Sequence, residues 1–192
     1  MTTSHTEEEK HWYALRVYRG VVGPVVAACR RDGMESYRPM MLVEQVTPDG
    51  VTYAEKTVVH NLLFVRATGS YVNEMQTVSR NRCSVYCHPG TRVPAAIDDH
   101  TMAMFMLVLK AGAHSAEPVD LPMDKGDKVR VTDGIFKGAE GYIRRVHGTR
   151  RFVVAIEGVV AVALTCIPRQ FLERIAPVVP AATHPQTPLL HF

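Results

Sequence analysis

The sequence predicts an α+β fold in two parts, a mixed sheet with helices followed by a small closed β-barrel. Between residues 11 and 110, segments with strand and helix periodicity alternate in the order βαβ(β)βαβα. Residues 129–172 hold about five short apolar runs, and closing them into a barrel would remove their exposed edges. Residues 112–122 combine small residues, two prolines and acidic charge without an apolar period, which predicts a linker.

The first part begins with a predicted strand over residues 12–18 (WYALRVY), which is rich in aromatic and β-branched residues. A helix is expected next, with Pro24 in its first turn and with Gly33 ending it after a basic pair. Residues 36–46 read as one strand, in which Pro39 favours an edge position or a bulge.

The TPDG turn at residues 47–50 leads into further strands and helices. The apolar spacing after residue 70 is helical, and an aspartate pair can cap the last helix. The resulting order is that of a split βαβ sheet with its helices packed mainly on one face. The predicted elements are strands at 51–57, 58–67 and 84–88, a helix at 70–80, and a helix from Asp98 or Asp99 to Lys110.

Residues 102–109 (MAMFMLVL) are apolar almost all round, unlike a surface helix with one buried stripe. Two interpretations are open. Other elements cover both sides of this helix, or a methionine-rich side is left for a partner or for the C-terminal barrel.

The predicted barrel starts with VRVTDGIFKGAEGYI, two alternating apolar runs joined by a loop that contains Gly134, Gly138 and Gly141. Glycine allows a positive φ and a close approach of two backbones, so this segment predicts a tight, curved hairpin. Further strands are expected at 142–146, 152–157, 159–165 and 167–172, the last interrupted by Pro168.

Charge differs between the predicted parts although the net charge is only +3. Residues 11–110 hold eleven Lys and Arg against eight Asp and Glu, a net +3, and residues 123–176 hold ten against six, a net +4. Such mild basicity can attract a polyanion but is equally common on an ordinary solvated surface.

The two ends are polar or proline-rich, and we expect residues 1–10 and 177–192 to be mobile tails. The start of the chain lacks the pattern of a targeting signal, and no uncharged run approaches the ~20 residues that span a bilayer. The sequence therefore predicts a soluble, cytoplasmic protein without membrane contact.

Metal, cofactor and catalytic signatures are weak. The four cysteines lie in different predicted elements and are expected to be buried thiols; Cys83, Cys87 and His88 could ligate zinc but lack a second pair of ligands. The glycine spacing suits turns and does not fit a dinucleotide fingerprint, and no common hydrolase or nucleotide-binding motif is present. We expect no enzyme, no catalytic residue, no metal and no cofactor.

Three segments resemble the NusG family of transcription elongation factors: HWYALRVYRG at 11–20, LLFVRAT at 62–68 and GDKVRVTDGIFKGAEGYIRRV at 126–146. The resemblance implies a ferredoxin-like NGN domain (11–111), a linker (112–122) and an SH3-like, five-stranded KOW domain (123–176). Within the family, the chain is most similar to specialised paralogues of the UpxY type. The KOW motif residues would be Gly134, Phe136, Gly138 and Gly141.

Family members act without catalysis, and the resemblance implies a monomer whose NGN sheet docks on the clamp of the largest RNA polymerase subunits. It would then suppress pausing or termination, for UpxY-type factors at particular operons such as surface or capsular polysaccharide clusters. Side-chain alternation gives the polymerase-binding candidates, with the alternative that Trp12 and Phe64 are simply core residues. The candidates are Trp12, Ala14, Arg16, Leu62 and Phe64.

Two arginine sets are candidates for binding nucleic acid. One flanks the turn at Gly148 and could contact nascent RNA or DNA, although a solvated hairpin tip is an equal alternative. The other lies in the first domain and could contact non-template DNA. The sets are Arg144, Arg145, Arg150 and Arg151, with His147 beside them, and Arg16, Arg19, Arg80 and Arg82.

The chain departs from the family pattern in two places. General NusG proteins carry Phe-Pro-Gly-Tyr where residues 59–62 here read VHNL. The loop that grips a ribosomal protein or the termination factor Rho presents an exposed Phe and a basic residue, where residues 156–160 read IEGVV. The second departure disfavours ribosome and Rho binding. A competing hypothesis is an RNA- or ribosome-binding KOW protein without polymerase contact, and a third is polymerase binding that promotes termination.

Overall fold

The computed structural model describes residues 8–18, 20–79, 82–112, 116–119, 127–164 and 167–175. The predicted tails lie almost wholly outside these ranges. In chain order the elements are β1 (His11–Val17), α1 (Val22–Arg31), β2 (Glu35–Tyr37), β3 (Met40–Thr47), β4 (Gly50–Thr57), β5 (Leu62–Ala67), α2 (Gly69–Val78), β6 (Cys83–Val85), β7 (Ala96–Ile97), α3 (Asp99–Ala111), β8 (Glu117–Pro118), β9 (Asp127–Val131), β10 (Glu140–Val146), β11 (Thr149–Ile156), β12 (Val160–Ala163), a 3-10 turn (Arg169–Phe171) and β13 (Leu172–Arg174). The fold is a mixture of helices and sheets, as the sequence predicts.

The N-terminal sheet holds its strands in the order β2, β5, β1, β6, and β7 also pairs with β1. The pairings of β1 and β5 with their neighbours are antiparallel, with Ala14 opposite Phe64. These two central strands are buried on both faces, which explains their nearly continuous apolar sequences. The order of strands and helices follows the prediction except at two places: residues 36–46 form two strands, and the short β7 before α3 was not predicted.

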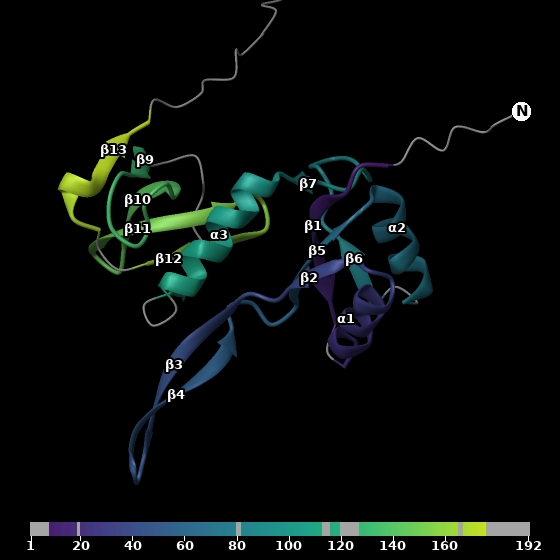
Figure 1. Ribbon diagram of the computed structural model, residues 1–192, viewed down its shortest axis with the longest axis horizontal. Helices are drawn as coiled ribbons and strands as arrows, with labels where there is room; N and C mark the ends of the chain where they lie inside the picture. Colours follow the sequence, from purple (N-terminus) through teal and green to yellow (C-terminus); the bar gives the residue numbers. More distant parts are fainter. Residues whose placement is uncertain are drawn as a thin grey trace, which may run out of the picture.

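Helices cover both faces of the N-terminal sheet (Figure 1). α1 and α2 lie on the face that carries Tyr13, Leu15 and Val17, where Val25, Cys29, Val72 and Met75 complete one core. α3 lies on the opposite face, where the Phe105 ring meets the Phe64 ring edge-on at 5.7 Å. The expectation of helices mainly on one face therefore describes α1 and α2 but is wrong for α3. Both faces of β1 and β5 are apolar, so both need a cover.

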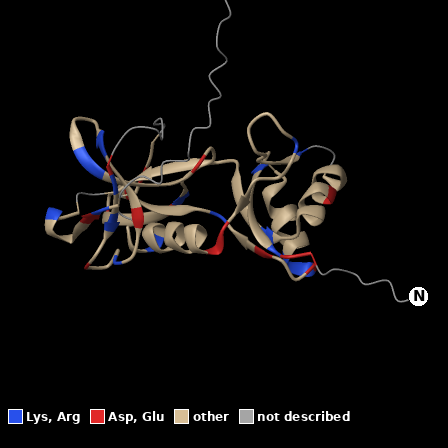
Figure 2. Ribbon diagram, turned by 90° about the horizontal axis from the view of Figure 1, so that it is seen from above, with Lys and Arg blue, Asp and Glu red and all other residues tan. Residues whose placement is uncertain are grey.

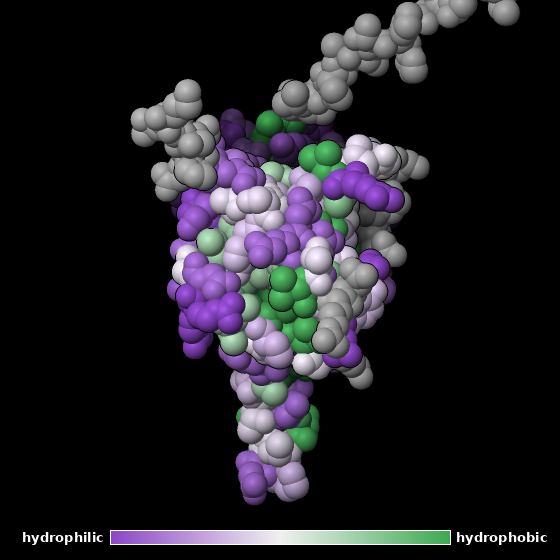
Figure 3. Space-filling view, turned by 90° about the vertical axis from the view of Figure 1, so that its right-hand side faces the viewer, coloured by the Kyte–Doolittle hydropathy of each residue, from purple (hydrophilic) through white to green (hydrophobic). Residues whose placement is uncertain are grey.

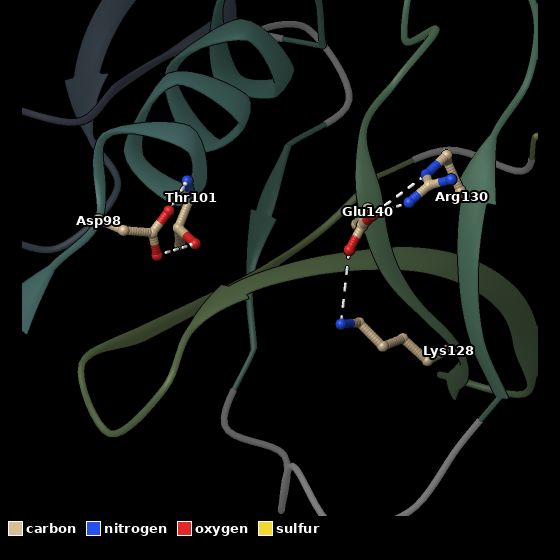
Figure 4. A network of polar contacts seen from close by, with 5 residues as sticks. All are labelled: Asp98, Thr101, Lys128, Arg130 and Glu140. Atoms are coloured by element: carbon tan, nitrogen blue, oxygen red, sulfur yellow. Dashed lines mark hydrogen bonds and ion pairs between the residues drawn. The ribbon is translucent and has the colours of Figure 1, made fainter. Parts of the chain in front are cut away.

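The helix ends follow the local signals in the sequence. Pro24 lies in the first turn of α1, and Gly33 has a φ of +69° just beyond its end. The Thr68 hydroxyl caps α2 by accepting a hydrogen bond from the Tyr71 N–H. At α3, the Asp98 carboxylate accepts hydrogen bonds from the Thr101 N–H at 2.8 Å and the Thr101 hydroxyl at 2.6 Å (Figure 4).

The predicted single strand over residues 36–46 is wrong, because the chain forms two strands there. β2 ends at Tyr37, and β3 starts at Met40 after Arg38 and Pro39. Proline lacks the N–H that a ladder needs, and the Pro39 carbonyl instead accepts a hydrogen bond from the Val58 N–H at 3.0 Å. β3 and β4 pair only with each other in the described structure and project away from both larger sheets as a long hairpin (Figure 1).

The C-terminal sheet has the strand order β13, β9, β10, β11, β12, β8. β9, β10, β11 and β12 correspond to runs expected after residue 127, but the strand predicted at 167–172 is wrong, because Arg169–Phe171 form a 3-10 turn after Pro168 and β13 starts only at Leu172. β8 lies within the segment predicted as a linker, and Pro118 stands opposite Val162 of β12. The edge position tolerates a proline, because β8 needs hydrogen bonds on one side only.

α3 packs between the two larger sheets and joins them in one core (Figure 1). Phe105, Val108 and Leu109 are buried together with residues of β1 and β5 and with residues of β11 and β12. At the end of the helix, a Cβ on Gly112 would lie 2.6 Å from the Leu164 Cδ2 atom. The structure combines the two interpretations of residues 102–109, because both sides of the helix are covered and the C-terminal sheet provides one of the covers.

Candidate functional site

Four of the five predicted polymerase contacts lie in the core. Trp12 is 8% exposed, Leu62 is 2% exposed, and Ala14 and Phe64 are fully buried on the face covered by α3. Arg16 is exposed at the end of the same strand. In this conformation the four buried side chains cannot reach a partner, which agrees with the alternative that the aromatic ones are core residues.

A hollow of about 280 Å³ opens directly beside this buried cluster. The Tyr37 ring lies 6.4 Å from the Phe64 ring and forms part of the hollow's wall. Its other walls come from the base of the β3–β4 hairpin and from the last turn of α3. The lining residues are Tyr37, Arg38, Met40, Met41, Leu42, Glu55, Leu109 and Lys110.

The break at Pro39 creates this hollow. Because β3 leaves the sheet after β2, the side chains of Met40 and Leu42 do not pack over the core, and both are half-buried. Met41 points the other way and packs against the shared core. Burial raises the pKa of Tyr37, so its hydroxyl is neutral at physiological pH.

The chemistry of the hollow suits a protein partner. Its floor is made of methionine, leucine and tyrosine side chains, and methionine adapts its shape to different apolar surfaces. Arg38, Glu55 and Lys110 bring charge of both signs to its margin. An apolar centre with a polar rim is the usual anatomy of a protein–protein contact.

The structure brings the C-terminal arginine set together on β10 and β11. Arg144 stands opposite Arg151, and Arg145 stands opposite Arg150. Figure 2 shows Lys and Arg on several strands of this sheet. Like charges directly opposite each other repel unless an anion lies near, and Glu117 of β8 supplies one carboxylate.

Glu117 contacts two side chains of this hairpin, Arg151 and His147. Its Oε2 atom lies 2.6 Å from the Arg151 Nη1 atom, and its Oε1 atom lies 3.0 Å from the His147 Nε2 atom. The Arg144 Nη2 atom is buried and has no hydrogen-bond partner among the described residues. Four arginines are thus gathered on this hairpin, and Glu117 of the neighbouring β8 pairs with one of them, Arg151.

The N-terminal arginine set is only partly described. The Arg16 guanidinium lies over the Tyr86 ring, 5.7 Å from its centroid, in a cation–π contact. Arg82 is exposed and precedes β6, and its carbonyl accepts a hydrogen bond from the Tyr18 N–H just after β1. Arg16 thus lies on β1 and Arg82 lies just before the neighbouring strand β6, whereas Arg19 and Arg80 lie outside the described residues.

Comparison with protein families decides the affiliation. The family model for NusG, described as "Transcription termination factor nusG", matches residues 10–106, which is half of the chain. The chain belongs to the NusG family. This family consists of non-enzymatic transcription elongation and termination factors that generally contact RNA polymerase. Comparison with curated proteins gives no significant match.

The match to NusG runs from the start of β1 into α3 and therefore includes most of the lining of the hollow. The C-terminal sheet lies beyond it. Within the described ranges, no helix combines the length and apolar character that crossing a bilayer requires.

The glycine loop of this NusG-family chain has the geometry that the sequence predicts. Gly134 and Gly138 have φ values of +81° and +88°, which favour glycine. A Cβ on Gly141 would lie 2.5 Å from the Val153 carbonyl oxygen and 2.8 Å from the Phe152 ring. Phe136 is 7% exposed and belongs to the shared core. The predictions of positive φ and of close backbone approach are confirmed.

Next to this loop, Glu140 of β10 binds two cations of β9 (Figure 4). Its Oε1 atom lies 2.6 Å from the Arg130 Nη2 atom, and its Oε2 atom lies 3.4 Å from the Lys128 Nζ atom. The hydrogen bond from Arg130 and the charge of Lys128 hold the pKa of Glu140 below its usual range. The charges of Lys128 and Arg130 are therefore partly neutralised.

Sequence reasoning missed the residues of the hollow. Tyr37, Met40 and Leu42 all fall within the segment that reads as one strand, where alternation alone gave them no special role. The available signal was the proline followed by two methionines, which interrupts the strand and supplies adaptable apolar side chains. The exposure of the hollow depends on how far β3 diverges from the N-terminal sheet, and no short sequence pattern determines that divergence.

Proposed function

We propose that this NusG-family chain is an elongation or antitermination factor that binds the RNA polymerase clamp, formed by the largest subunits, through its N-terminal sheet. The family match over residues 10–106 carries this proposal, because the matched segment contains the sheet and most of the hollow. The N-terminal part would then be the NGN domain, of the ferredoxin-like type, at residues 11–111.

The contact surface we propose is the hollow rather than the predicted strand face. Met40 and Leu42 are half-buried and free of the shared core, so they can be covered by a partner without any rearrangement. Trp12, Ala14, Leu62 and Phe64 would act beneath them by holding Tyr37 and α3 in place. Arg16, which is exposed, keeps its proposed role at the margin of the complex.

Binding alone can produce the effect on transcription. A factor that binds the elongating form of polymerase more tightly than the paused form shifts the population toward elongation by its difference in affinity. An affinity ratio of about ten corresponds to about 1.4 kcal/mol, which is enough to change the lifetime of a pause.

For the C-terminal sheet we propose the KOW assignment, with an SH3-like barrel at 123–176 and a linker at 112–122. The motif would comprise Gly134, Phe136, Gly138 and Gly141. The exposed Glu157 at the β11–β12 turn supports the expectation that ribosomal protein and Rho are disfavoured partners. The four arginines of β10 and β11 support contact with nascent RNA or DNA.

The same arginines favour the second candidate function, an RNA-binding KOW protein without polymerase contact. The specific observation is their pairing across the hairpin, with Arg144 opposite Arg151 and Arg145 opposite Arg150, which gathers four guanidinium groups on two strands. Salt-sensitive RNA binding by the full chain, in the absence of any affinity for polymerase, would establish this candidate instead.

A restricted role at particular operons, as in the UpxY type, is part of the proposal. Mapping the chain and polymerase along the genome tests it. Occupancy confined to a few transcription units, such as those for surface polysaccharides, would support the specialised role, whereas occupancy of most units would indicate a general factor.

Binding to purified RNA polymerase tests the contact surface. Leu42→Asp places a charge in the hollow, and because burying an unpaired carboxylate is costly, we expect the dissociation constant to rise about tenfold or more. The matched control is Val93→Asp, at a side chain that is 60% exposed and lies outside the hollow. Titration of labelled polymerase with each variant measures the effect.

Two outcomes would contradict the proposal. The first is that the wild-type chain does not bind polymerase at micromolar concentration. The second is that Leu42→Asp and Val93→Asp both bind as tightly as wild type. Circular dichroism and thermal melting of both variants guard against misreading an unfolded protein as a binding defect.

A further inference from the structure

The β3–β4 hairpin, residues 40–57, is a long projecting element with almost no core of its own. We call it the arm. Its strands pair over eight positions, from Met40 opposite Thr57 to Thr47 opposite Gly50. None of its residues is classed as buried, whereas β1 and β5 are buried along most of their length. The arm extends well beyond the body of the molecule (Figure 1).

The outer half of the arm carries an exposed apolar patch. Val46 is 83% exposed, Val51 is 56% exposed and Tyr53 is 55% exposed. Val46 and Val51 stand directly opposite each other, and Tyr53 is two positions further along the same face, opposite Glu44. Figure 3 shows the arm projecting below the body with apolar atoms on one of its sides. Large apolar side chains gathered at the end of a projection mark an interaction surface.

The arm also lacks the support that sheets normally need. A two-stranded hairpin is at best marginally stable in water, and three strands or a covering helix are needed for independent stability. Both outer edges of the arm are without a paired strand in the described structure. A partner that covers the patch would supply the missing burial.

Charge selects the class of partner. The arm carries Glu44, Asp49 and Glu55 against Lys56, a net charge of −2, whereas the chain as a whole has a net charge of +3. Phosphates would be repelled, so a nucleic acid does not fit. A second copy joined arm to arm would bring carboxylates together, which is also unfavourable. A protein surface with cations around an apolar depression fits both the patch and its charge.

We propose that the arm is a second docking surface, which binds a cationic, apolar site on RNA polymerase. This inference rests on the proposed function, because it assigns a second contact to the same partner. Six residues separate Met40 in the hollow from Val46 in the patch, which spans about 20 Å along a strand. The two contacts are therefore distinct but lie on one continuous hairpin, and this connection makes the second contact effectively intramolecular.

Binding of purified RNA polymerase by a triple variant, Val46→Thr, Val51→Thr and Tyr53→Thr, tests the inference. Threonine retains a high β propensity, so the strands should persist while the apolar patch is lost. We expect the dissociation constant to rise about tenfold, because an aromatic residue and its apolar neighbours often dominate a contact. The matched control is Val93→Thr, at an exposed valine outside both the arm and the hollow.

A second variant, Glu44→Gln with Asp49→Asn, isolates the charge of the arm, because it leaves Glu55 in the lining of the hollow unchanged. We expect slower association with polymerase and a weaker dependence of that rate on salt, since rim charges act mainly on encounter. Stopped-flow association at two salt concentrations measures both effects. Circular dichroism of each variant checks that the strands remain.

The outcomes separate this inference from the proposed function. If the wild-type chain does not bind polymerase, the proposed function fails and the inference fails with it. If wild type binds, and the triple variant binds equally well, only the inference is overturned. It is also overturned if the triple variant instead abolishes DNA binding, or abolishes self-association seen by light scattering.

Discussion

At the scale of single residues, Gly141 shows how the C-terminal sheet depends on one missing side chain. Its neighbours across the strands are Val129 on one side and, by close approach, the Val153 carbonyl on the other. The Phe152 ring fills the space where a Cβ would be. The core around this ring therefore requires glycine for reasons of space, and Gly141 does not have the positive φ of Gly134.

Gly141→Ala should destabilise the protein. A methyl group 2.5 Å from a backbone oxygen forces a shift of β11, and overpacking of this kind costs about 1 to 3 kcal/mol. The free energy of unfolding from urea titration measures it.

Gly23→Ala is the matched control, because Gly23 lies in α1 and a Cβ added there would meet no other atom within 4 Å. We expect its free energy of unfolding to exceed that of wild type by up to about 1 kcal/mol. Equal stability of Gly141→Ala and wild type would contradict the close packing described for β10 and β11.

Residue identity alone predicted the backbone of the glycine loop but left open whether the predicted polymerase contacts are surface or core residues. The positive φ angles of Gly134 and Gly138 could be predicted because only glycine adopts them without strain. Trp12 and Phe64 could not be assigned to core or surface, because alternation names the face of a strand but does not name what covers it. Here α3 covers that face, from more than thirty residues further along the chain than Phe64.

At the scale of elements, α3 is the helix whose position matters most, and its start is fixed by Asp98. The carboxylate accepts two hydrogen bonds from Thr101, and they hold the pKa of Asp98 below its usual range. A lowered pKa means that the ionised cap stabilises the folded state at neutral pH. That contribution is lost as the pH falls through the unfolded value of 3.8 and then through the folded one.

Asp98→Ala should lower the free energy of unfolding by about 1 kcal/mol at pH 7. Because the wild-type cap is lost in acid, the difference between the two proteins should shrink as the pH falls from 5 to 3. Thermal melting across that range measures it. Asp98→Asn is the control, since it retains a capping oxygen without the titration, and a constant difference at all pH values between wild type and Asp98→Ala would contradict the assignment.

Elements with a strong local signal were predicted well, and elements defined by distant contacts were not. The cap at Asp98 and the end of α1 near Gly33 follow from short sequence patterns. The sequence predicted an edge position or a bulge at Pro39 but not the division of residues 36–46 into two strands, because a proline on an edge strand can either form a bulge or end the strand. β8 was hidden in a segment whose composition resembles a linker, since two paired residues leave no periodicity.

At the scale of the whole molecule, α3 links the two sheets into one packed body. The sequence indicated this through a helix that is apolar nearly all round, but it did not indicate which element covers each side. Phe105 and Leu109 belong to the same core as Phe152 and Leu164. The arm projects away from this junction (Figure 1), so its apolar patch remains accessible while the two sheets are packed together.

Single-round transcription by purified RNA polymerase, over a template with a pause site and a terminator, tests the central claim most directly. With wild-type chain we expect shorter pauses and more read-through, and with Leu42→Asp we expect the pattern of polymerase alone. Unchanged pausing and termination at saturating wild-type chain, or increased termination, would contradict the account.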